Sequence, residues 1–397
     1  MRMNNCNYKP KHGLMMAYIA TWFIAPILEY GSIYRVLVIG AMMLFALSTI
    51  LSGRIRMEYA IILFLIVYIA IIGFFTGVPI TKHMGAFIFM SCTLIVLYFS
   101  TCEEPWRYIR IIHFVYLLCI IFNLTTIREL LVNPNVMRFL VRNSDISVSL
   151  SKSGVGGYGY CYTVLCIIPF AIGDIVKRER LFFEKCLCVL FLLTSYFMIF
   201  KSGYFMSMIL AVLCGPLFFL CRIKDQKRRA IYIVVLLVAA IMLSVSFEGI
   251  ADTLITHTDN NLIQRKISEI VSLASGDSAS IADGEFGTRY QRYMKDFRLM
   301  FTSPIWGTWG VNNGNHSYIL DFFASYGLIL GGVYFSSLLR IIKSTYIEYS
   351  PASQTMLYIL VIVLSLNAMA PSLGFVLFVL MPIYSSRDAL EEQIWQS

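Results

Sequence analysis

Residues 287–331 carry the side chains of this sequence that are best suited to chemistry. Four cations recur every three residues, and a turn with Pro and Gly separates them from His316. His316 stands at the start of a long apolar run. Positive charge concentrated beside a bilayer favours an anionic lipid phosphate as the ligand. The four cations are Arg289, Arg292, Lys295 and Arg298.

Arg289 and Arg292 are the strongest candidates for direct chemistry, because they share one face at the start of a predicted helix. Guanidinium forks, free N–H groups and the helix dipole can act there together on a phosphate. Donors of this kind neutralise the charge that develops on a departing diphosphate. Lys295 is a further candidate diphosphate ligand. Lys295 and Arg298 are equally compatible with headgroup anchoring, which contributes about 1 kcal/mol per cation.

His316 follows the polar turn at 312–315. A neutral imidazole there could accept a proton from a sugar hydroxyl or donate a hydrogen bond to phosphate, although an interfacial histidine without chemistry is the alternative. Lys201 lies in a tight turn between two apolar runs, and Arg138 and Arg142 lie in the loop at 127–153. These three could join the diphosphate site, or Lys201 could simply snorkel to water.

The composition is that of a polytopic membrane protein. Hydrophobic residues make up 58% of the chain, charged residues 14%, and the mean hydropathy is +0.73, values that exclude an ordinary soluble fold. The net charge of +9 is typical of the loops that orient membrane proteins, and nothing indicates nucleic-acid binding. None of the ten cysteines falls in the loops at 127–153 and 248–315, so neither a disulfide framework nor a zinc site is expected.

About twelve membrane-spanning helices are predicted from apolar runs of roughly 20 residues. They lie near 14–29, 33–51, 58–76, 84–100, 108–126, 155–175, 183–200, 203–221, 230–247, 316–342, 354–370 and 371–386. Asn367 and Pro371 would mark the turn between the last two, unless these form one kinked span. Asp321 would lie within a span, where a charge costs about 2.5–3.5 kcal/mol, so it should face a polar cavity or pair with a cation.

With the N-terminus placed in the cytoplasm, the inside segments hold more than half of the 32 Lys and Arg, as the positive-inside rule requires. Both long loops then lie outside. This divides the chain into a membrane part at 1–247, an external loop domain at 248–315, and a membrane part with a cytoplasmic tail at 316–397. In the loop domain we expect one helix at 261–274 and a second, amphipathic helix that begins at a Thr288 cap and ends at Thr302. The second should lie flat in the headgroup layer.

The region at 287–331, about 45 of the 397 residues, resembles the O-antigen polymerase and O-antigen ligase superfamily of bacterial inner membranes. The shared pattern is an Arg-bearing amphipathic helix, a Pro with closely spaced Gly, a His followed by Ser, and a Gly after nine further residues. The matching residues are Arg289, Pro304, Gly307, His316, Ser317 and Gly327. The chain departs from the pattern at Gly310, which comes one residue late, at Leu330, and at Lys201, where the family often has Arg.

The resemblance implies an all-α, GT-C-like membrane glycosyltransferase with its site at the periplasmic face of the inner membrane. It would move a growing glycan from undecaprenyl diphosphate to the next lipid-linked repeat unit in lipopolysaccharide or other polysaccharide biosynthesis. Arg289 and Arg292, with Lys201 assisting, would stabilise the diphosphate, and His316 would orient or deprotonate the acceptor. No metal and no cofactor is expected, since no Asp-x-Asp motif occurs in an outside loop.

Three other readings stay open at this point. A ligase would use the same donor with lipid A-core as the acceptor, and Leu330 breaks the ligase-type ending. A transporter or flippase typically has internal repeats and broken helices, and no repeat is visible in the sequence. A non-enzymatic scaffold would leave the row of cations unexplained. Besides the undecaprenyl-diphosphate-linked oligosaccharide and membrane lipids, the resemblance allows a chain-length regulator as a partner.

Overall fold

The chain is an all-α, multi-pass membrane protein, as its sequence predicts. The computed structural model describes residues 10–25, 57–75, 108–140, 145–177, 181–245, 285–309, 316–345, 350–367 and 370–396, with isolated positions at 40, 44, 47, 264 and 268. All regular structure in these ranges is helical. Within them, six helical segments are long and apolar enough to cross a membrane, and two shorter helices are also apolar.

The six candidate segments are α5 (Arg110–Val132), α8 (Tyr158–Val176), α9 (Phe182–Lys201), α10 (Phe205–Arg222), α16 (Tyr318–Thr345), and the consecutive α18 (Pro371–Phe375), η3 (Val376–Leu380) and α19 (Met381–Gln396). The shorter apolar helices belong to α1 (Pro10–Ile24) and α17 (Pro351–Leu366). Helices α3 (Met57–Phe75) and α11 (Gln226–Val245) cover two further predicted spans. The predicted spans at 33–51 and 84–100 lie almost entirely outside the described residues.

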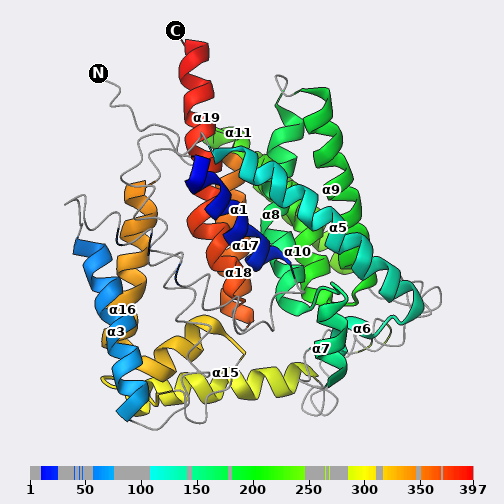
Figure 1. The fold of residues 1–397 in the computed structure, drawn as a ribbon. Coiled ribbons are helices and arrows are strands. Elements are labelled where there is room, and N and C mark those ends of the chain that lie inside the picture. The colour runs from blue at the N-terminus through cyan, green and yellow to red at the C-terminus, as the bar shows by residue number, and fades with distance from the viewer. Residues whose placement is uncertain are drawn as a thin grey trace.

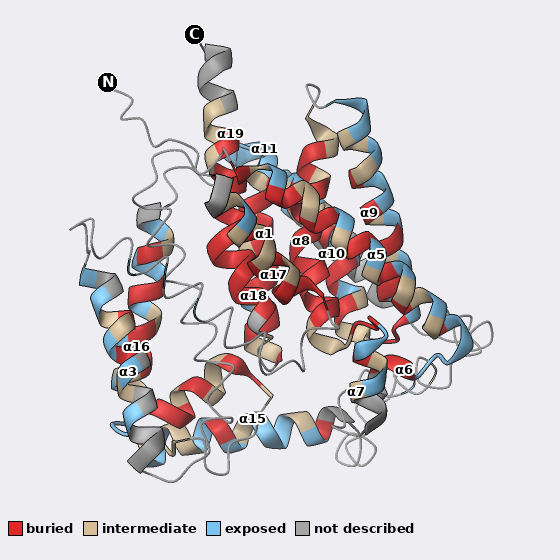
Figure 2. Ribbon diagram, viewed as in Figure 1, coloured by how far each residue is buried: buried red, intermediate tan, exposed pale blue. Residues whose placement is uncertain are grey.

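Helix α8 forms the centre of the bundle and packs against α9, α10, α17 and α18 (Figure 1). It is apolar around its whole circumference, and most of its residues are buried (Figure 2), as expected for a helix enclosed by others. Helices α9 and α10 instead keep an exposed apolar side that includes Leu193 and Val212. That side is suited to contact with lipid.

The predicted turn between the last two apolar runs is confirmed. Helix α17 ends at Leu366, Asn367 is extended, and the next helix starts with Pro371 in its first turn. Proline is favoured there because its missing N–H would have no partner inside the helix and its φ is already helical.

Opposite ends of the bundle carry different groups. At one end Tyr204, which precedes α10, contacts the first residue of α8, Tyr158, and α15 (Glu285–Thr302) lies across this end (Figure 1). At the other end Lys177, just after α8, forms an ion pair with Asp388 of α19. Buried Arg387 pairs there with buried Asp174.

Three local predictions are corrected by the structure. Helix α15 begins at Glu285, so Thr288 lies inside it rather than at its cap. Helix α5 continues to Val132, and the first long loop contains the short helices α6 (Val136–Phe139) and α7 (Asp145–Lys152). The predicted span at 316–342 is broken at Gly327, whose φ of 79° is not helical. Of the predicted helix at 261–274, only Gln264 and Ser268 are described.

Candidate functional site

Helix α15 brings its first cations to the end of the bundle. Residues three or four apart share one helix face, and on this face the Tyr293 hydroxyl donates to the Leu366 carbonyl at 2.6 Å. That bond fixes α15 against the last residue of α17. Farther along the same helix, Asp296 is fully buried. The middle of α15 is therefore held against the bundle by the Tyr293 hydrogen bond and by burial.

Arg292 and His316 meet directly. The Arg292 Nη1 lies 2.8 Å from the His316 Nε2. Because a guanidinium has only donors, Nε2 must accept, so in this contact the imidazole is neutral and carries its proton on Nδ1. The His316 ring also packs edge-on against Tyr293, with ring centroids 6.4 Å apart. Two residues that the sequence separates by 24 positions thus form one polar unit.

The start of α16 fixes His316. Buried Ser317 precedes the first helical residue, and its Oγ accepts from the Leu320 N–H at 3.2 Å. This is N-capping by serine, which satisfies a free donor of the first turn. The Ser317 carbonyl accepts from Asp321 at 2.7 Å. The His-Ser pair of the sequence is therefore an imidazole placed directly before a capped helix.

Arg289 lies one turn before Arg292, and its charge acts on the phenols of Tyr158 and Tyr162 at the start of α8. It also acts on Tyr293 within its own helix. Burial raises the pKa of Tyr293, the Arg289 charge opposes that shift, and Asp321 adds to it. The Tyr293 phenol is thus kept protonated, as its bond to the Leu366 carbonyl requires.

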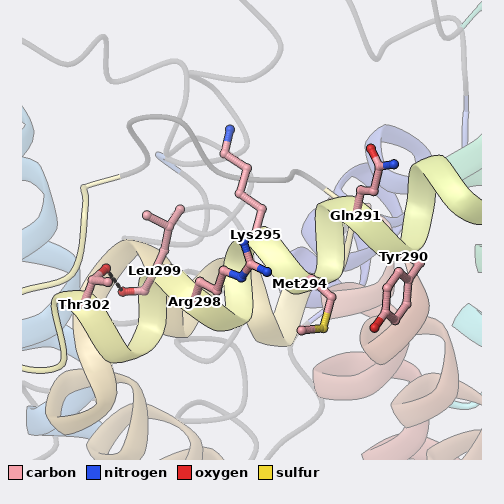
Figure 3. A pocket seen from close by; sticks show the side chains of 7 residues that line it. All are labelled: Tyr290, Gln291, Met294, Lys295, Arg298, Leu299 and Thr302. Carbon is pink, nitrogen blue, oxygen red and sulfur yellow. Dashed lines mark hydrogen bonds between the residues drawn. The ribbon is translucent and has the colours of Figure 1, made fainter.

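The structure does not bring Lys201 and Lys295 into this group, and the Arg138 and Arg142 side chains lie outside the described part of the chain. Lys295 and Arg298 line an open hollow of about 440 Å³, and every described residue that lines it belongs to α15 (Figure 3). The Lys201 ammonium lies over the Phe197 ring of its own helix, 5.9 Å from the centroid, in a cation–π contact. Arg138 falls in α6, where only its backbone is described, and Arg142 lies outside the described residues.

The turn after α15 is joined to the break in α16 by backbone hydrogen bonds. The N–H groups of Thr308 and Trp309 donate to the carbonyls of Ala324 and Ser325, both at 2.8 Å, and the Leu328 N–H donates to the Pro304 carbonyl. We call these two segments, 304–309 and 324–328, the backbone clasp. Its Gly307 and Gly327 both have positive φ, and a Cβ on Gly327 would lie 2.4 Å from the Ile305 carbonyl oxygen.

Sequence reasoning missed part of this site. The Tyr158 hydroxyl donates to the Asn367 Oδ1, and the Asn367 carbonyl accepts from the Tyr318 N–H at 3.0 Å. Tyr204 packs edge-on against Tyr158 and donates to the Met137 carbonyl at 2.8 Å. These groups come from helices far apart in the sequence, and no local spacing marks them.

Comparisons with known proteins add no assignment: no protein family matches the chain, and no curated protein matches it. The site must therefore be interpreted from its own groups. Among the described residues, no three His, Cys, Asp or Glu side chains come together in a way that could hold a metal ion. What the site offers is two guanidiniums for an anion and one neutral imidazole for a proton.

Proposed function

We propose that this chain is an O-antigen polymerase, a glycosyltransferase with a lipid-linked donor. It transfers a growing glycan from undecaprenyl diphosphate to the next lipid-linked repeat unit. The observation that carries the proposal is the 2.8 Å contact between Arg292 and His316, with Arg289 one turn away on the same helix. An anion-binding pair beside a proton acceptor is what a diphosphate leaving group and a hydroxyl nucleophile require.

In the proposed reaction, the acceptor hydroxyl oxygen attacks the anomeric carbon of the donor glycan. The new C–O bond forms as the bond from that carbon to the diphosphate oxygen breaks, and the hydroxyl proton passes to the His316 Nε2. Arg289 and Arg292 take the charge that develops on the diphosphate. Since Arg292 occupies Nε2 in this structure, its turning towards the diphosphate would free the imidazole to accept the proton. This single displacement inverts the anomeric centre.

The proposal includes a setting in the membrane. We infer a GT-C-like arrangement of about twelve spans in the bacterial inner membrane, with α15 in the periplasmic headgroup layer. Exposed Trp306 and Phe301 near the end of α15 support an interfacial location. The exposed segment at 222–229 carries five cations, and it joins α10 and α11 at the end away from Tyr204, which suits the cytoplasm.

A transporter is the rival from another class, and the broken helix α16 is a feature that transporters share. In a transporter, the unwound carbonyls of such a break coordinate the transported ion. Here the carbonyls of Ala324 and Ser325 already accept from Thr308 and Trp309. The break is thus filled by the protein's own backbone, which favours an enzyme.

The test is complementation of a strain that lacks this gene. Arg289→Ala, Arg292→Ala and His316→Ala should each abolish long surface polymer while the protein still accumulates in the membrane. Arg298→Ala is the matched control, because it removes the same charge from the same helix at a position that lines the open hollow. Full-length polymer in the His316→Ala strain would refute the assignment.

The same strains separate polymerase from ligase. Loss of a polymerase leaves lipid A-core that bears one repeat unit. Loss of a ligase leaves bare core and accumulates lipid-linked polymer. We expect the first pattern, because Leu330 stands where the ligase-type motif requires a different residue.

A further inference from the structure

Asn367 contains a buried hydrogen-bonding group that the described part of the chain leaves unpaired. The residue is 1% exposed, and its Nδ2 has no hydrogen-bond partner among the described residues. Its Oδ1 accepts from the Tyr158 hydroxyl. Leaving a buried donor unsatisfied is costly, so this amide is an exception that calls for a reason.

A second buried asparagine shows what a purely structural amide looks like in this protein. The Asn123 Nδ2 donates to Thr194 and Ser195 at 3.3 and 3.0 Å, and its Oδ1 accepts from Tyr160 at 2.9 Å. Both its amide groups are satisfied inside the bundle. Asn367 differs in having one amide group left over, and it lies at the end of the bundle where the candidate site is.

The surroundings of Asn367 are neutral and aromatic. The Tyr158 ring packs edge-on against the rings of Tyr162 and Tyr204, with centroids 4.7 and 5.3 Å apart. Aromatic faces with neutral donors and acceptors suit sugar rings and their hydroxyls, whereas guanidiniums suit phosphates. Tyr293 donates to the carbonyl of Leu366, the residue before Asn367, and its ring packs against His316, so the neutral group borders the cationic one.

We propose that Asn367 and the ring of Tyr158 form a glycan subsite beside the diphosphate site, with the free amide N–H donating to a hydroxyl of the bound sugar. The proposal rests on the proposed function and adds which groups recognise the carbohydrate. The amide nitrogen is covered, so the sugar reaches it when the partly exposed Tyr158 side chain moves aside. The subsite recognises neutral hydroxyls, and Arg289 and Arg292 of α15 recognise the diphosphate.

The experiment uses the full chain in nanodiscs and two probes. One is undecaprenyl diphosphate, which has no sugar. The other is the lipid-linked repeat unit extracted from a strain that lacks this gene. Asn367→Asp keeps the acceptor for Tyr158 and removes the free N–H. We expect it to weaken binding of the repeat unit by about tenfold, the equivalent of one hydrogen bond, and to change binding of undecaprenyl diphosphate by less than about twofold.

Asn123→Asp is the control, and it should lower thermal stability without changing the affinity for either probe. If Asn367→Asp does not fold, Asn367→Ala replaces it, since that change removes the unsatisfied donor. Unchanged affinity for the repeat unit would overturn the subsite, and an equal loss for both probes would assign Asn367 to the diphosphate instead. Failure of the wild-type protein to bind either probe would overturn the proposed function itself, and the subsite with it.

Discussion

Arg292 and His316 act directly on each other. The guanidinium holds the imidazole in one tautomer, and the imidazole keeps the guanidinium at the start of α16. When two groups act as a unit, removing either one abolishes the effect of both. The rate losses caused by the two single substitutions should therefore not be additive. Measured rates of the single and double variants therefore test the pairing of Arg292 with His316 quantitatively, which complementation alone does not.

We predict that His316→Ala lowers the polymerisation rate by about 10²–10⁴-fold, the range for loss of a general base. Arg292→Ala should lower it comparably, and the double variant should be no slower than the worse single variant. Arg292→Lys keeps the charge but loses the fork, so it should recover only part of the rate. The measurement is initial rate on extracted lipid-linked repeat units, and fully additive losses would show that the two side chains work independently.

The sequence predicts those groups of the site that form local patterns along the chain, and it does not predict those that depend on contacts between distant segments. Arg289, Arg292 and His316 were identifiable because charge spacing and the apolar boundary are local patterns. Tyr158 and Asn367 were not, since a lone tyrosine at a helix start looks like many others in an aromatic-rich chain. The sequence did place Asn367 in a turn, but the contact that makes it chemically informative joins α8 to α17.

The backbone clasp explains the spacing of the glycines at 307 and 327. Gly307 lies against the 324–328 segment of the clasp, and Gly327 lies against the 304–309 segment. At each glycine a carbonyl of the other segment comes so close that a side chain would block it. Trp309 completes it with a left-handed φ of 54° and packs its ring against Tyr326 and against Tyr68 of α3. Helical periodicity across 316–342 hid this break, because the apolar pattern continues through it.

Replacement of Gly327 by Ala tests the clasp. Its φ of 79° and ψ of 167° lie in a region that is essentially restricted to glycine, and the added Cβ would meet the Ile305 carbonyl. We expect a loss of about 1–3 kcal/mol of stability from the backbone conformation alone, measured as a lower midpoint of thermal aggregation in detergent.

Gly332→Ala is the matched control for this substitution. Gly332 lies in the same helix, and a Cβ there would meet nothing within 4 Å. Alanine is favoured over glycine inside a helix by about 1 kcal/mol, so this variant should be as stable as the wild type or slightly more so. Equal midpoints for the two alanine variants would show that the clasp contributes nothing.

The end of the helix bundle away from α15 is held together by a buried ionic network. Arg387 pairs with Asp174, lies over the ring of Tyr384, and is joined by the pair of Lys177 and Asp388. A charge left alone in such a place is costly, whereas replacing a whole pair is often tolerated. The network joins α8 to α19, and α8 also begins at the candidate site.

Arg387→Ala should therefore lower the free energy of unfolding by about 3–5 kcal/mol, as expected when one partner of a buried pair is removed. The double variant Asp174→Asn with Arg387→Gln should recover much of that loss. Size-exclusion profiles of solubilised protein measure both. The affinity for undecaprenyl diphosphate should remain unchanged in whatever folded protein is recovered, and a selective loss of that affinity would show that this end takes part in binding.

The orientation of the molecule can be tested with its own cysteine. Cys186 is exposed near the start of α9, at the end away from Lys201. In the proposed topology it faces the cytoplasm. A membrane-impermeant thiol reagent should thus label it in inverted membrane vesicles and spare it in intact spheroplasts, with Cys186→Ser as the reference for other cysteines. Labelling in spheroplasts would put the candidate site in the cytosol and end the periplasmic assignment.

The clasp also has a mechanical consequence. Where main chain touches main chain, there are no rotatable side chains to absorb a displacement, so the two segments shift as a single rigid piece. Any tilt of α15 that follows engagement of a substrate phosphate must then be passed to the second half of α16 and to α3 beside it. A spin label on exposed Leu339 would register events that occur at Arg292.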